Sequence, residues 1–164
     1  MRCNVVALNW KLKGAAAHRT RMGRIELSIK DDITLGLSAT IISTRDEVVK
    51  ACERAAAVLG THAQTSVASA KVSVKILPGL VQKLSKVSPL VAINLQPGEN
   101  NSISLSAKIE RYVGLQSRFF LIPISPKRLL GKAHYLNFLT SLEQELRAID
   151  KGGGQFRRVG GRAA

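Results

Sequence analysis

Basic side chains are the residues of this 164-residue chain whose chemistry is easiest to name. Residues 71–132 carry ten Lys or Arg residues against two acids, Glu99 and Glu110. Ammonium and guanidinium groups that gather without acids bind phosphate or carboxylate groups. This block therefore predicts an anion-binding site. Its candidate residues are Lys71, Lys75, Lys108, Arg111, Arg118, Ser125, Lys127, Arg128 and Lys132.

One arrangement of these residues is a basic sheet face. Lys71 and Lys75 alternate with apolar residues, and Lys108 and Tyr112 do the same in a later segment. Alternating side chains leave opposite faces of a strand. Such a face would bind the phosphates of nucleic acid or of an anionic membrane surface. The alternative is a solvated lysine-bearing face that keeps the sheet soluble.

A second arrangement places the anion at a helix start. Ser125-Pro126 is typical of a helix N-terminus, where free N–H groups attract anions, and Lys127, Arg128 and Lys132 lie close by. The alternative is that the helix begins later, near Lys132 and just after Gly131, with the two preceding basic residues solvated on a loop.

Catalytic and metal-binding motifs are absent from the sequence. The three histidines, His18, His62 and His134, are far apart and match no metal-ligand spacing, and we interpret His134 as a surface helix residue. No nucleophile elbow, P-loop or dinucleotide fingerprint occurs. We therefore predict a non-enzymatic protein without metal or cofactor; the alternative is an enzyme whose site has no visible motif.

Periodicity predicts the elements that position these residues. Strict alternation predicts strands over Arg24–Lys30, Ile33–Ile42, Lys71–Leu77, Leu90–Gln96 and Ser102–Val113. The apolar run Arg118–Ile124 predicts a more deeply buried strand, and the polar segment Thr61–Ser69 predicts a loop.

Two helices are expected. A capping box, Thr44-Arg-Asp-Glu47, precedes a helix over Asp46–Leu59, with Cys52 as a buried free thiol on its apolar side. The last helix ends before Gly152. Its apolar positions are Tyr135, Phe138, Leu139, Leu142, Leu146 and Ile149.

The resulting order predicts an α+β fold, an antiparallel sheet of about five to six strands with one face covered by two helices. The order resembles the β-α-β4-α arrangement of TATA-binding-protein-like and helix-grip folds, with extra N-terminal strands. No motif accompanies the resemblance. It implies an alternative function, binding of an apolar ligand or lipid between helix and sheet, against a filled core. The candidate lining residues are Phe119, Leu121, Leu136, Phe138 and Leu142.

Domain organisation follows from charge and composition. We predict an extended basic segment over 1–23, one domain over 24–150 and a disordered Gly/Arg-rich tail over 151–164, which share a net charge of +14. No apolar run reaches the roughly 18 residues that span a bilayer, so a cytoplasmic location is expected. The best functional hypothesis is a non-catalytic binding domain with an anionic partner.

Overall fold

Six longer strands, four short strands and two long α-helices make up most of the chain that the structure describes. The computed structural model describes residues 29, 32–77, 88–123 and 128–160. The longer strands are β1 (Gly36–Ile42), β2 (Ala63–Val67), β3 (Lys71–Ile76), β4 (Leu90–Pro97), β5 (Ser102–Arg111) and β10 (Gln155–Val159). The helices are α2 (Arg45–Ala57), α3 (Lys132–Ile149) and the short 3-10 helix η1 (Gly60–His62). The short strands are β6 (Gly114–Leu115), β7 (Arg118–Phe119), β8 (Ile122–Pro123) and β9 (Arg128–Leu129).

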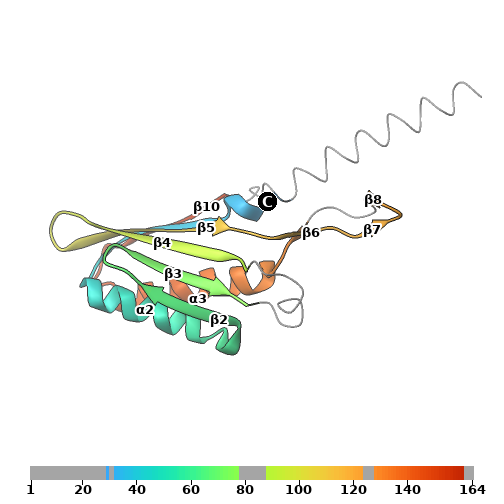
Figure 1. Cartoon of the computed structure of the whole chain (residues 1–164). Coiled ribbons are helices and arrows are strands. Elements are labelled where there is room, and N and C mark those ends of the chain that lie inside the picture. The colour runs from blue at the N-terminus through green and yellow to red at the C-terminus, as the bar shows by residue number, and fades with distance from the viewer. Residues whose placement is uncertain (1–28, 30–31, 78–87, 124–127, 161–164) are drawn as a thin grey trace, which may run out of the picture.

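The longer strands form one antiparallel sheet in the order β10-β1-β5-β4-β3-β2. Helices α2 and α3 lie side by side on one face of this sheet (Figure 1). The predicted α+β class with an antiparallel sheet is therefore confirmed. Between α2 and α3 the six-stranded sheet takes four strands, β2–β5, of which β3, β4 and β5 were predicted. The additional strand, β10, follows the last helix.

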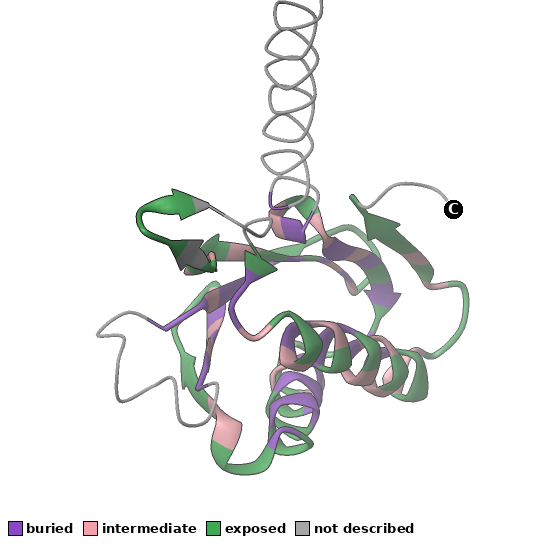
Figure 2. Cartoon of the chain, turned by 90° about the vertical axis from the view of Figure 1, so that its right-hand side faces the viewer, coloured by how far each residue is buried: buried purple, intermediate pink, exposed green. Residues whose placement is uncertain are grey.

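The core fills the space between the sheet and the helices (Figure 2). Alternate residues of β1, β3, β4 and β5 point into it, as their period-2 patterns predict. These residues are Leu37, Ala39, Ile41, Val72, Val74, Ile76, Val91, Ile93, Leu95, Ile103, Leu105 and Ala107. Helix α3 contributes the predicted Tyr135, Phe138, Leu139, Leu142 and Leu146, all buried.

The start of α2 is held by the predicted capping box. The Glu47 N–H donates to Thr44 Oγ1 over 3.3 Å, and the Thr44 N–H donates to Glu47 Oε2 over 2.9 Å. These bonds satisfy N–H groups that have no partner within the helix. On the buried side of α2, burial raises the pKa of the Cys52 thiol to about 12. The prediction of a buried free thiol is confirmed.

Four expectations about local structure are wrong. Residues 32–34 are helical, so the first strand begins at Gly36. The expected loop 61–69 contains β2, which pairs with β3 although its side chains are largely exposed. The expected disordered tail contains β10, which pairs with β1. Within the expected buried strand 118–124, residues 118–123 instead form the hairpin β7–β8, in which residues 119–122 are exposed.

Other expectations lie outside the described residues. These are the predicted extended segment 1–23, the strand over 24–30 apart from Ile29, and the tail end 161–164. Among the described residues, no helix is both long enough and apolar enough to cross a membrane.

Candidate functional site

The sheet face opposite α2 and α3 is polar. We call it the open face, because neither α2 nor α3 packs on it (Figure 1). Cross-strand partners share a face of a sheet. By the registers, the open face carries Ser38, Thr40, Ser73, Ala92, Asn94, Ser104 and Ser106 together with several lysines.

Lys75 and Lys108 lie on this face, as the alternation predicts. Lys75 pairs with Leu90 of β4, and Lys108 pairs with Ala92 of the same strand. Both pairs lie near the end of the sheet where β5 leaves it. The two ammonium groups therefore extend from the same part of the open face.

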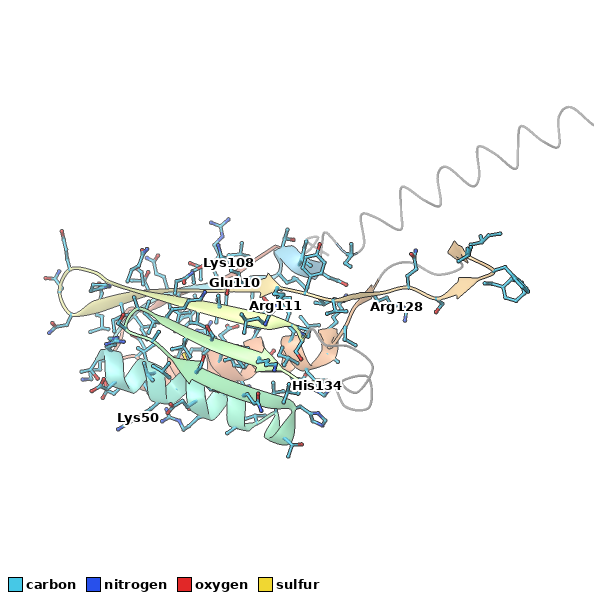
Figure 3. The ribbon with its side chains drawn as sticks, viewed as in Figure 1. Lys50, Lys108, Glu110, Arg111, Arg128 and His134 are labelled. Atoms are coloured by element: carbon cyan, nitrogen blue, oxygen red, sulfur yellow. The ribbon has the colours of Figure 1, made fainter. Side chains whose placement is uncertain are left out.

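A bulge brings Arg111 to the same face. Simple alternation from Lys108 would send Arg111 toward the helices, because the two positions are three residues apart. The pairing of β4 with β5 shifts register between Leu90 and Val91, so that Arg111 pairs with Leu90, whose other neighbour is Lys75. An extra residue in one strand changes which face the following side chains occupy. Arg111 thus lies on the open face with Lys75 and Lys108. Figure 3 labels Lys108 and Arg111.

Lys71 is neutralised by an ion pair. Its Nζ lies 2.8 Å from Glu110 Oε2, and this ion pair connects β3 to β5 across β4. Glu110 is one of the two acids in the block 71–132. Among the described residues, no carboxylate lies within ion-pairing distance of Lys75, Lys108 or Arg111.

A two-stranded arm continues from this end of the sheet (Figure 1). We define the arm as residues 114–123 and 128–129, in which β6 pairs with β9 and β7 pairs with β8. Its base is anchored in the core, because Leu129 is buried and the Leu130 N–H donates to the Val113 carbonyl over 2.8 Å. Arg128, beside Leu129, is exposed and has no acidic partner among the described residues.

We name Lys75, Lys108, Arg111 and Arg128 the arm-end cluster. All four were predicted to bind an anion. Lys75, Lys108 and Arg111 lie at the end of the sheet from which the arm extends. Arg128 lies further along the arm, opposite Leu115 (Figure 3). Of the other predicted residues, Lys71 lies on the same face but is paired, and Arg118 lies in β7. Ser125 and Lys127 fall outside the described residues.

The outer end of the arm is apolar. We define the tip as Phe119–Ile122, whose four residues are 62, 83, 87 and 57% exposed in chain order. The rings of Phe119 and Phe120 meet edge to face, with centroids 4.7 Å apart. Phe119 and Leu121 therefore do not line a cavity with the buried Phe138 and Leu142, and this part of the apolar-ligand hypothesis is wrong.

The predicted anion site at the start of the last helix is also wrong in its geometry. Helix α3 begins at Lys132, after Gly131 at φ 74°, and not at Ser125-Pro126. Glycine adopts a positive φ at little energetic cost because it has no Cβ atom, so Gly131 allows the chain to turn into α3. Lys132 Nζ lies 2.6 Å from Asp32 Oδ1, so the cation at the helix start already has an anion from within the chain.

Two of the three histidines meet, which their separation in sequence did not indicate. The rings of His62 and His134 stack with centroids 4.9 Å apart, and His62 Nδ1 lies 2.9 Å from the Leu77 carbonyl oxygen. Within the described part of the chain, no three His, Cys, Asp or Glu side chains group as a metal site would require. The stacked pair links η1 to α3, so we interpret both rings as packing residues.

A hollow of about 410 Å³ lies at the opposite end of the sheet from the arm. Arg45 and Lys151 line it beside the start of α2. The Glu47 carboxylate is hydrogen-bonded to Ser43 and Thr44, which line the hollow. The hydrogen bond from the Thr44 N–H, then those from the Ser43 and Thr44 hydroxyls, lower its pKa to about 2. The hollow is therefore a weaker candidate than the arm-end cluster.

The comparisons with known proteins give no assignment. No family model, no curated protein and no solved structure matches the chain.

Proposed function

We propose that the protein is a non-catalytic binding domain that holds an anionic partner, through phosphate groups, with the arm-end cluster. The observation that carries this proposal is the convergence of Lys75, Lys108 and Arg111 on one end of the open face, where none of the described carboxylates pairs with them. Like charges on the same face of a sheet repel one another, here between β3 and β5 across β4. Phosphates bound between them would remove that repulsion.

Five of the described carboxylates are held in hydrogen bonds or ion pairs within the fold, which supports binding rather than proton transfer. Glu47 caps α2, Glu110 pairs with Lys71, and Glu143 pairs with Arg147 and Arg158. Asp32 pairs with Lys132, and Asp150 accepts from the Ile42 N–H. Each of these carboxylates has a structural role, whereas the arm-end cations have none that the described contacts reveal.

The test is binding of the full chain to labelled DNA, labelled RNA and anionic vesicles across a salt series. The full chain is required, because β10 belongs to the sheet and a truncation after residue 150 would remove that strand. We expect binding that weakens steeply as salt rises. Each cation near a phosphate surface contributes about 1 kcal/mol to binding. Lys75→Glu with Lys108→Glu should therefore lower the affinity at least tenfold.

Lys50→Glu is the matched control. Lys50 is an exposed lysine on α2, on the far side of the molecule from the open face (Figure 3). The substitution changes net charge in the same direction without touching the cluster. Equal losses for Lys50→Glu and for each cluster substitution would attribute binding to overall charge and contradict the proposal. The cytoplasmic location stays a prediction from the sequence.

A further inference from the structure

The tip exposes apolar surface that the fold does not use. Its four consecutive large side chains are each more than half exposed, at the end of a projecting arm (Figure 2). Other exposed apolar side chains are isolated, such as Val58 at 66% on the end of α2. Scattered single residues of that kind are ordinary, whereas a contiguous apolar patch marks an interaction site.

The backbone of the tip is also unfavourable for the residues it carries. Phe120 and Leu121, the two residues between β7 and β8, have φ of 45° and 66°. A two-residue hairpin with positive φ at both positions prefers Asn and Gly. Bulky residues in this conformation are strained, and strain of this kind is concentrated at functional sites. The turn presents two large apolar side chains at the furthest point of the arm.

The chain around the tip is basic. Between Glu110 and Glu143 there are five Lys or Arg residues and no acid. Arg128 pairs in register with Leu115, four residues before Phe119. At strand spacing this places its backbone roughly 13 Å from the tip. Tyr112, 45% exposed, lies at the base of the arm.

We propose that the tip inserts into the interface of an anionic lipid bilayer, with Arg128 at the level of the lipid phosphates. This inference rests on the proposed function and names the partner as a membrane. Apolar side chains that lie on a membrane enter the interface by about 5–10 Å. The long side chain of Arg128 can extend toward the headgroups from a backbone position roughly 13 Å behind the tip.

The arrangement fits a bilayer better than a protein groove or nucleic acid. A groove that accepts four apolar side chains needs no cation beside them, whereas Arg128 is exposed on the same arm. Nucleic acid would be bound by cations and by stacked rings, but it gives Leu121 and Ile122 no apolar surroundings. An anionic bilayer contacts both groups at once.

The experiment places a single fluorescent tryptophan at the tip of the full chain. Phe120→Trp is made in a Trp10→Phe background and titrated with vesicles of phosphatidylcholine alone or with phosphatidylserine. We expect a blue shift and quenching by brominated acyl chains only with anionic vesicles. Val58→Trp in the same background is the matched control, because it is similarly exposed but far from the arm; its emission should not change.

A second variant separates insertion from adhesion. Phe120→Asn with Leu121→Gly keeps the turn and removes its apolar side chains, and circular dichroism checks that it folds. Because each buried Leu or Phe side chain changes partitioning by about tenfold or more, vesicle binding should fall roughly 100-fold. The residual binding should be more salt-sensitive than that of the unmodified chain.

The outcomes are distinguishable. If the tip variant and the unmodified chain bind anionic vesicles equally and the emission of the Phe120→Trp variant does not shift, insertion is refuted while the anionic partner stands. Cluster-dependent binding to nucleic acid but not to vesicles refutes the membrane and retains the proposed function. Concentration-dependent oligomers that the tip variant abolishes, without vesicle binding, would instead show the tip to be a self-association surface. Absence of all binding refutes both proposals.

Discussion

Two hairpins of this chain end in turns of similar backbone geometry and opposite chemistry. The β4–β5 hairpin turns through Asn100 and Asn101 at φ 55° and 58°, and its Ser102 N–H donates to the Glu99 carbonyl over 3.0 Å. The β7–β8 hairpin turns through Phe120 and Leu121 at φ 45° and 66°. Asparagine adopts positive φ readily, whereas a bulky apolar residue does not.

The first turn stabilises the fold, whereas the second presents apolar side chains at the surface. The asparagine turn closes the sheet and leaves polar groups in water. The Phe-Leu turn is unfavourable both in its backbone and in its exposed apolar area, and the arm contributes little to the core beyond Leu129 and Leu130. Substitutions at the tip should therefore change the free energy of unfolding differently from substitutions in the core or in the asparagine turn.

The largest effect should separate a buried phenylalanine from an exposed one. Phe138 is 0% exposed in the core and Phe120 is 83% exposed at the tip. We expect Phe138→Ala to lower the free energy of unfolding by about 3–5 kcal/mol, since a cavity remains in the core. Phe120→Ala should change it by less than about 0.5 kcal/mol. Denaturant unfolding of the two variants measures both values; a large loss for Phe120→Ala would mean that the tip packs within the fold.

An exchange of the two turns should give effects of intermediate size and opposite sign. Phe120→Asn with Leu121→Gly should raise the free energy of unfolding by about 1–2 kcal/mol, because backbone strain is relieved. Asn100→Phe with Asn101→Leu should lower it by a similar amount. Thermal and denaturant melts of the two variants provide the measurement. Loss of stability in both would show that the Phe-Leu turn stabilises the arm.

The smallest effect is a difference in pH dependence. Three carboxylates outside the arm have lowered pKa values. The pKa of Glu47 is lowered to about 2, mainly by the hydrogen bond from the Thr44 N–H. Hydrogen bonds from Arg147 and from the Ile42 N–H are the main causes of the lowered pKa values of Glu143 and Asp150, respectively. Their contribution is complete above their unfolded-state pKa values and is lost as pH falls through the folded-state values. Stability should therefore decline from about pH 5 toward pH 2.

The arm provides the contrast for this titration. Since no acid occurs between Glu110 and Glu143, the stability difference between the tip variant and the unmodified chain should be the same at pH 7 and pH 3. Urea unfolding at the two pH values tests this. A stability difference that changes with pH would show that the tip interacts with a titrating carboxylate outside the arm.

Local interactions are the part of this structure that the sequence determines by itself. The capping box at Thr44 and the helical spacing of the apolar residues specify α2 and the length of α3 that is buried. Alternation specifies β1, β3, β4 and β5 and the face on which Lys75 and Lys108 lie. These features depend on residues within a few positions of one another, so their signals are readable before any tertiary contact forms.

Tertiary structure alone decided the rest. The run Arg118–Ile124 is apolar enough for a core, but an apolar run is buried only if another element packs on it, and none of the described elements does. Gln155–Val159 becomes a strand because β1, more than a hundred residues earlier, offers an edge with unpaired backbone groups. Arg111 joins the cluster because of a register shift against β4. Each outcome depends on a partner distant in sequence, and no local pattern encodes that partner.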